Sequence, residues 1–210
     1  MSTLFFDLDG TLWDASGSTS RAWTEVLSSR RKGLTVSSRQ IQDVAGRPYL
    51  ECLAAIYPEA FDLPDLEGLL EELARAERHW MLAASGELYP GVREGLNALS
   101  EANTLFLVSN CADWYLESFL EASRTRDFFA DATCFGLTGL PKRDNLLALK
   151  RKHGVDAGFY IGDTAGDRDA AAAAGLTYVH MTYGFGGKDL GARHRFASFG
   201  ALTDHFLAVT

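Results

Sequence analysis

The sequence predicts an α/β fold: a doubly wound parallel sheet that carries an inserted set of helices. Short apolar segments bounded by turn residues are typical of strands, and helical patterns alternate with the later ones. This alternation favours a parallel sheet covered by helices. One connection is far longer than a single crossover helix needs, which indicates an insert. The strands are expected at residues 4–8, 104–108, 132–135, 158–161 and 177–181.

All of these segments except 132–135 are nearly continuous in apolar residues. Continuous apolar strands are typical of parallel sheets that are buried on both faces. The connections between such strands are expected to be right-handed. The sequence therefore predicts a helix in each later crossover or beside it, at residues 90–100, 113–122, 144–152 and 166–174.

The first crossover predicts an inserted helical domain at residues 14–89, and the sheet domain is then 1–13 together with 90–210. No segment of the insert resembles a strand. Serine or threonine caps, a Ser-x-x-Gln capping box, a helix-starting proline and helix-ending glycines indicate where its helices begin and end. The expected helices run from Ser18 or Thr19 to Gly33, from Ser37 to Gly46, and from Pro64 to Ala84 before Gly86.

The composition is that of a soluble globular protein of 210 residues, with 47% hydrophobic residues and a net charge of -8. No basic stripe is longer than residues 30–32, so nucleic acid is not expected as a partner. Three cysteines without metal-ligand spacing indicate a reducing compartment. Without space for a signal peptide or an apolar run near the roughly 20 residues of a membrane span, we expect a cytoplasmic protein with no membrane partner.

Polar side chains follow several of the expected strands, where ligands bind in doubly wound sheets. Asp7 and Asp9 follow the first strand, Ser109 and Asn110 the second, and Asp163 the fourth, with Asp167 and the crossover residue Lys142 nearby. Each piece alone also fits a common turn, a helix cap or a surface lysine. A calcium loop is excluded, because its twelfth position would need glutamate and is serine here.

Taken together, these pieces resemble the haloacid dehalogenase-like phosphohydrolase superfamily, and within it the phosphoglycolate phosphatase-like subgroup. The motifs are "DLDGT" at 7–11, "VSN" at 108–110, Lys142, and "GDTAGD" at 162–167, so the resemblance spans the chain. It implies a Rossmann-like sheet with strand order 5-4-1-2-3 and a helical cap inserted after the first motif.

The resemblance also implies roles for the two aspartates of the first motif. Asp7 is the nucleophile that forms an aspartyl-phosphate, and Asp9 is the acid that protonates the leaving alkoxide and then the base that activates water. The two roles require different protonation states. A carboxylate can attack a phosphate ester only where cations and fixed donors neutralise the phosphoryl oxygens.

The cation implied by the resemblance is Mg²⁺, which prefers oxygen ligands. Its ligands are then Asp7, the backbone carbonyl of Asp9, and Asp163, while Asp167 acts through a water or by orienting Lys142. The remaining contacts to the phosphoryl oxygens are implied for Ser109, the backbone amide of Asn110, and Lys142.

Some assignments remain open at the level of sequence. Many family members have proline directly after the lysine, whereas here Pro141 precedes Lys142, so Arg143 is kept as a fallback. In the cap, Arg47 either contacts a carboxylate or hydroxyl of the substrate or is an ordinary loop arginine. Trp13 either lines the cleft or packs the hinge, and the glycine-rich loop 182–187 either belongs to the site or only turns the chain.

The predicted function is a Mg²⁺-dependent phosphatase that acts on a small phosphomonoester, as a monomer or a small homo-oligomer. A dehalogenase would not need Asp9, so its presence disfavours that activity. A phosphonatase needs a lysine in the cap, and the only lysine of residues 14–89 is Lys32, beside Arg30 and Arg31, which also disfavours that activity. A phosphomutase of the β-phosphoglucomutase type remains an alternative. So does a binding or regulatory module that keeps the fold without turnover.

Overall fold

A computed structural model describes residues 1–83, 88–187 and 189–208 of the chain. Its parallel sheet has six strands in the order β3-β2-β1-β4-β5-β6. The expected order 5-4-1-2-3 is confirmed, and the additional β6 pairs with β5 at the edge. The strands are β1 (Thr3–Phe6), β2 (Thr104–Ser109), β3 (Asp131–Cys134), β4 (Phe159–Gly162), β5 (Thr177–Met181) and β6 (His194–Phe196).

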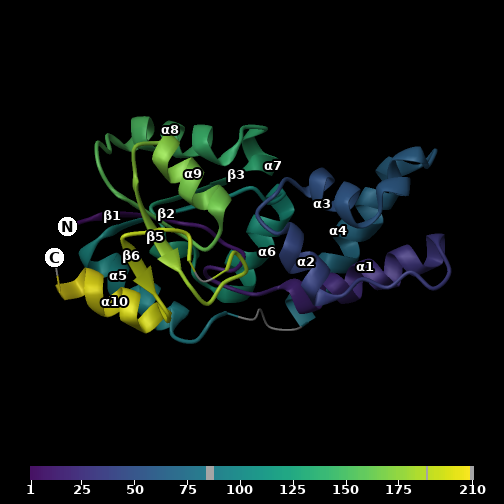
Figure 1. Cartoon of the computed structure of the whole chain (residues 1–210), viewed down its shortest axis with the longest axis horizontal. Helices are drawn as coiled ribbons and strands as arrows, with labels where there is room; N and C mark the ends of the chain where they lie inside the picture. The colour runs from purple at the N-terminus through teal and green to yellow at the C-terminus, as the bar shows by residue number, and fades with distance from the viewer. Residues whose placement is uncertain (84–87, 188, 209–210) are drawn as a thin grey trace.

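Helices cover both faces of this sheet (Figure 1). On one face, α5 (Val92–Ala102), α6 (Asp113–Ser123) and α10 (Phe199–Ala208) pack against alternate residues of the central strands. On the other face, α8 (Lys142–His153) and α9 (Ala165–Ala173) pack against the intervening residues. Two faces buried in this way explain why the central strands are nearly continuous in apolar residues.

Several element boundaries differ from the expected ones. The strand expected at 4–8 ends at Phe6, and the helix expected from 144 begins at Lys142. Outside the insert, the elements that the sequence did not lead us to expect are η2 (Arg126–Phe128), α7 (Phe135–Thr138), β6 and α10. Within the insert, α3 (Tyr49–Ile56) and η1 (Pro58–Asp62) were not expected either.

The first crossover contains the helices α1 (Ser16–Arg30), α2 (Ser38–Val44), α3 (Tyr49–Ile56) and α4 (Leu66–Ala83), with a 3-10 turn η1 (Pro58–Asp62). The capping box of Ser37 and Gln40 is confirmed. The expected caps at Ser18 and Thr19 are wrong, because α1 begins at Ser16, whose backbone N–H donates to the Asp14 side chain at 2.8 Å. The expected end of the last helix near Ala84 and Gly86 lies outside the described residues.

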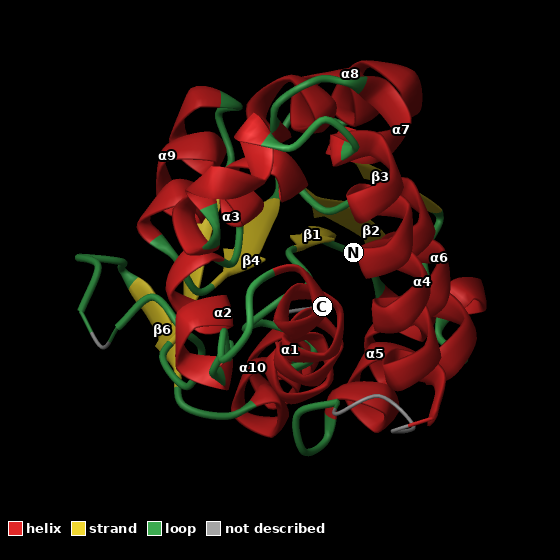
Figure 2. Cartoon of the chain, turned by 90° about the vertical axis from the view of Figure 1, so that its right-hand side faces the viewer, coloured by secondary structure: helices red, strands yellow, loops and turns green. Residues whose placement is uncertain are grey.

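These helices project from one end of the sheet and lie in front of its strands in Figure 2. They share a hydrophobic cluster of their own around Trp23, Leu53 and Leu73, whereas Met81 packs with the core cluster. The separate cluster supports our proposal that residues 14–89 form a cap domain. Among the described helices, none is long and apolar enough to cross a membrane.

Candidate active site

Lys142 joins two aspartates from different strand ends in a buried ion-pair network. Its Nζ atom lies 2.7 Å from Oδ1 of Asp7 and 2.6 Å from Oδ1 of Asp167. All three side chains are at most 5% exposed. Burying one of these charges alone would be costly, so each depends on the others for its ionised state.

Asp167 accepts several hydrogen bonds in addition to its contact with Lys142. Its Oδ2 atom accepts hydrogen bonds from the Asp163 N–H, the Thr164 N–H and the Thr164 hydroxyl, at 3.1, 2.9 and 2.7 Å. Burial alone would raise its pKa, yet the ion pair and hydrogen bond with Lys142 hold the pKa of Asp167 below its ordinary value. Asp167 therefore favours its ionised form and pairs with Lys142.

The loop after β5, residues 182–187, positions Asp163. From the sequence, this loop could either belong to the site or only turn the chain. The backbone N–H groups of Phe185 and Gly186 donate to the Oδ2 atom of Asp163 at 2.6 and 3.3 Å. A Cβ atom on Gly184 would lie 2.4 Å from the Cβ of Asp163 and 2.3 Å from the carbonyl oxygen of Gly10. Only glycine permits this approach, so the loop 182–187 is part of the site.

The carboxylates of Asp7, Asp163 and Asp167 suit a hard divalent cation. Each offers an oxygen, and these three atoms lie within 4.8 Å of one another. Burial, followed by repulsion from Asp167, raises the pKa of Asp163 to about 7, and the same two effects raise the pKa of Asp7. Three buried carboxylates share one lysine, so an oxygen-seeking cation fits the charge of this cluster.

Asp9 lies apart from this network and faces a cavity. Its Oδ1 atom accepts hydrogen bonds from the Tyr115 hydroxyl at 2.6 Å and from the Trp13 indole N–H at 3.2 Å. Burial raises the pKa of Asp9 to about 6, and these two hydrogen bonds limit the rise. An aspartate of this kind can hold and release a proton near neutral pH.

The second expected motif connects the core to the helical insert. Ser109 is 3% exposed, and its hydroxyl accepts a hydrogen bond from the Cys111 N–H at 3.2 Å. The Asn110 side-chain amide donates to the Gly46 carbonyl at 2.8 Å. The neighbouring Arg47 lines the same cavity as Asp9 and Ser109, so the structure brings this predicted residue to the site.

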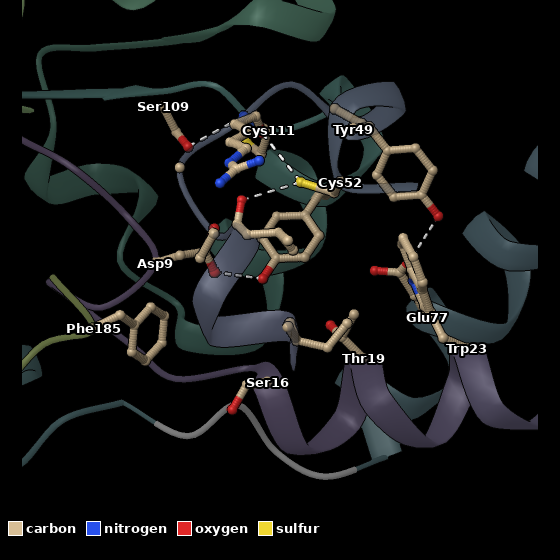
Figure 3. Close-up of a pocket in the computed structure, with 17 residues that line it drawn as sticks. Asp9, Ser16, Thr19, Trp23, Tyr49, Cys52, Glu77, Ser109, Cys111 and Phe185 are labelled. Carbon is tan, nitrogen blue, oxygen red and sulfur yellow. Dashed lines mark hydrogen bonds between the residues drawn. The ribbon is translucent and has the colours of Figure 1, made fainter. Parts of the chain in front are cut away.

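The helices of the insert form the far wall of that cavity (Figure 3). Glu77 on α4 is 1% exposed and accepts hydrogen bonds from Trp23 and Tyr49. In Figure 3 it lies across the cavity from Asp9. Glu77 could not be recognised from the sequence, because a single glutamate in a charged helix gives no signal of burial.

The contacts of Arg143 and Trp13 indicate their roles, which the sequence left open. Arg143 is exposed and pairs with its neighbour Asp144, so Lys142 rather than Arg143 occupies the site. Trp13 is fully buried against Tyr115 and Phe119, and it also holds Asp9. Tyr115 was missed as a site residue because it lies in an ordinary amphipathic helix.

The model of the haloacid dehalogenase-like hydrolase family matches residues 1–175 of the chain. A phosphoglycolate phosphatase from Aliivibrio fischeri is 31% identical over 191 residues, covering 86% of this chain and 83% of the relative. A phosphoglycolate phosphatase from Nitrosospira multiformis is 30% identical over 201 residues, covering 89% and 86%.

Solved structures agree in fold. A predicted phosphoglycolate phosphatase from Haemophilus somnus has a TM-score of 0.80 at 20% identity, covering 98% of this chain and 97% of the other. A haloacid dehalogenase-like hydrolase from Streptococcus pneumoniae has a TM-score of 0.78 at 19% identity, with 98% of each chain covered. The chain therefore belongs to the haloacid dehalogenase-like hydrolase family.

Proposed function

We propose that the protein is a Mg²⁺-dependent phosphatase that hydrolyses a small phosphomonoester through an aspartyl-phosphate on Asp7. The observation that carries this proposal is the buried bridge from Lys142 to Asp7 and Asp167, with Asp163 in the same cluster. The names of the relatives, phosphoglycolate phosphatase, support the substrate class and make 2-phosphoglycolate a natural compound to test.

In this mechanism Asp7 attacks phosphorus, and Lys142 neutralises charge on the phosphoryl oxygens. Ser109 and the Asn110 N–H hold further phosphoryl oxygens. The cation, for which we propose the ligands Asp7, Asp163 and the carbonyl of Asp9, supplies positive charge that offsets the repulsion between the nucleophile and the phosphate.

Asp9 completes the cycle in two proton transfers. It first gives a proton to the oxygen of the leaving alcohol, which departs as Asp7 becomes phosphorylated. It then takes a proton from the water that attacks the aspartyl-phosphate and releases inorganic phosphate. A pKa of about 6 and a place at the cavity wall support both transfers.

The test is hydrolysis of p-nitrophenyl phosphate with Mg²⁺ or with EDTA, for the wild type, Asp7→Asn and a control. Asp131→Asn is a matched control because Asp131 also pairs with a lysine, at 2.8 Å, but on the surface. We expect Mg²⁺-dependent release of inorganic phosphate, a loss of about 10³-fold or more in Asp7→Asn, and little change in the control.

Acid quenching followed by peptide mass spectrometry should find the phosphoryl group on Asp7. Retained activity in Asp7→Asn would rule out this nucleophile. Transfer of the phosphoryl group to a sugar hydroxyl in place of water would identify a phosphomutase instead. A folded protein without metal-dependent activity on any phosphoester would identify a binding module.

A further inference from the structure

We propose that Glu77 selects the leaving group, and that the substrate is the phosphomonoester of an alcohol that carries a second hydroxyl or an amine rather than a carboxylate. This inference rests on the proposed phosphatase function. It concerns the end of the cavity opposite to the phosphoryl site, where the leaving alcohol must lie.

Glu77 is placed to contact a ligand across the cavity from Asp9 (Figure 3). Its side chain belongs to α4, within a wall that also includes Thr19 and Trp23 of α1. Asp9 meets the oxygen that links the phosphoryl group to the leaving alcohol in the proposed mechanism. The far end of that alcohol therefore points towards Glu77.

The groups that bind Glu77 are neutral donors. The Trp23 indole N–H donates to its Oε1 atom at 2.6 Å, and the Tyr49 hydroxyl donates to the same atom at 2.5 Å. These donors favour a carboxylate but bring no positive charge, so the negative charge at this wall is not cancelled by an ion pair with them.

The positively charged side chain of the cavity lies where the helical insert meets the core. Among the described residues that line it, Arg47 is the one lysine or arginine. The adjacent Gly46 carbonyl accepts a hydrogen bond from Asn110, which belongs to the proposed phosphoryl site. We therefore assign Arg47 to the phosphoryl side and Glu77 to the leaving-group side.

This arrangement has a chemical consequence for the substrate. A carboxylate on the leaving group would meet Glu77 as a like charge, whereas a hydroxyl would donate a hydrogen bond to it and an ammonium would form an ion pair. Like charges brought together in a desolvated site oppose binding strongly. The names of the relatives point to a carboxylate-bearing substrate, and Glu77 predicts a different preference for this chain.

The experiment compares four two-carbon esters that differ only at the far end: ethyl phosphate, 2-hydroxyethyl phosphate, O-phosphoethanolamine and 2-phosphoglycolate. Burial raises the pKa of Glu77 to about 7, so kcat/KM is measured at about pH 8 with Mg²⁺ to keep the side chain ionised. Binding of the same esters to Asp7→Asn, measured by calorimetry, gives a readout that does not need turnover.

For the wild type we expect kcat/KM to be higher for the hydroxyl and amine esters than for ethyl phosphate, and lower for 2-phosphoglycolate. The highest and lowest values of kcat/KM should differ by about tenfold or more. In Glu77→Gln the ratio of the amine ester to the carboxylate ester should shrink by about tenfold or more. Glu77→Asp keeps the charge and should keep the order of preference.

Glu25→Gln is the matched control. Glu25 on α1 accepts a hydrogen bond from the Trp80 indole on α4 at 3.0 Å, so it joins the same two helices, but it lies outside this cavity. Its variant should retain the wild-type order of the four esters. If Glu77→Gln does not fold, two measurements still test the proposal. They are the order of kcat/KM for the four esters in the wild type and the order of their affinities for Asp7→Asn.

A wild-type preference for 2-phosphoglycolate over ethyl phosphate would overturn the inference while leaving the phosphatase function intact. The same holds if Glu77→Gln folds, hydrolyses p-nitrophenyl phosphate and keeps the amine-to-carboxylate ratio. Loss of the phosphatase function itself would show differently, as a folded wild type without Mg²⁺-dependent hydrolysis of p-nitrophenyl phosphate.

Discussion

Two regions of the molecule bury acidic side chains in different ways. At the strand ends, Asp7 and Asp167 both form ion pairs with Lys142, at 2.7 and 2.6 Å. In the wall formed by the inserted helices, Glu77 is equally buried but is held by an indole and a phenol. In the first region the carboxylates form ion pairs with a lysine. In the second region the carboxylate accepts hydrogen bonds from neutral groups.

The two kinds of burial suit different functions. Opposite charges held at the ends of strands and helices suit a reaction in which charge moves, because the groups are already oriented before the substrate arrives. A carboxylate held by neutral donors still attracts hydrogen-bond donors and cations from a ligand. The helical wall is thus suited to recognition, and the strand ends to chemistry.

Among the variants that test this difference, we expect Lys142→Met to have the largest effect, which is on the free energy of unfolding. The substitution leaves two buried carboxylates without their cation, so the free energy of unfolding in Mg²⁺-free buffer should fall by about 3–5 kcal/mol. Urea unfolding at pH 7 measures it. Lys152→Met removes a lysine that is 66% exposed and pairs with Asp131, and it should cost about 1 kcal/mol or less. Equal losses in the two variants would contradict this account.

A smaller effect should come from the titration of Glu77. Burial raises its pKa from 4.5 to about 7 in the folded protein, so the folded state binds the proton more tightly than the unfolded state. The resulting stabilisation is complete below about pH 4.5 and is lost as the pH rises through about 7.

Glu77→Gln lacks this titration. The stability of the wild type relative to Glu77→Gln should therefore fall by about 3 kcal/mol between pH 4.5 and 8, since each pKa unit is worth about 1.4 kcal/mol. Urea unfolding of both proteins across this range provides the measurement. A difference that does not change with pH would mean that Glu77 is solvated in the folded state.

The smallest effect is expected from two matched tyrosine variants. Tyr115→Phe removes a donor to Asp9, and Tyr49→Phe removes a donor to Glu77. Tyr115→Phe should lower kcat for ethyl phosphate by about tenfold, and less for p-nitrophenyl phosphate, whose leaving group departs as a stable anion. Tyr49→Phe should lower kcat by the same factor for both substrates. If both variants showed the same dependence of kcat on the leaving group, Asp9 and Glu77 would not have the separate roles proposed here.

Much of the core and its motifs could be predicted because the signals are local. The apolar strands, the aspartates that follow them and the capping box at Ser37 each depend on residues a few positions apart. The strand order followed from the resemblance of the motifs to a known family. Strand β6 was missed because a three-residue edge strand with the sequence "HRF" has no clear pattern.

The residues that were missed at the site depend on contacts between distant segments. Tyr115 reaches Asp9 across 106 positions. Glu77 lies in a helix whose other acidic residues are mostly solvent-exposed, so its burial follows only from the packing of α4 against α1. Periodicity does not distinguish such a residue from its neighbours.

The sequence by itself determined the fold class, the family resemblance and the set of polar residues at the strand ends, because strand pattern and motif spacing are properties of short segments. The tertiary structure alone decided that Lys142 contacts both Asp7 and Asp167, that the loop 182–187 holds Asp163, and that Glu77 faces the cavity. The physical reason is that burial and electrostatic neutralisation depend on which surfaces meet when the chain folds.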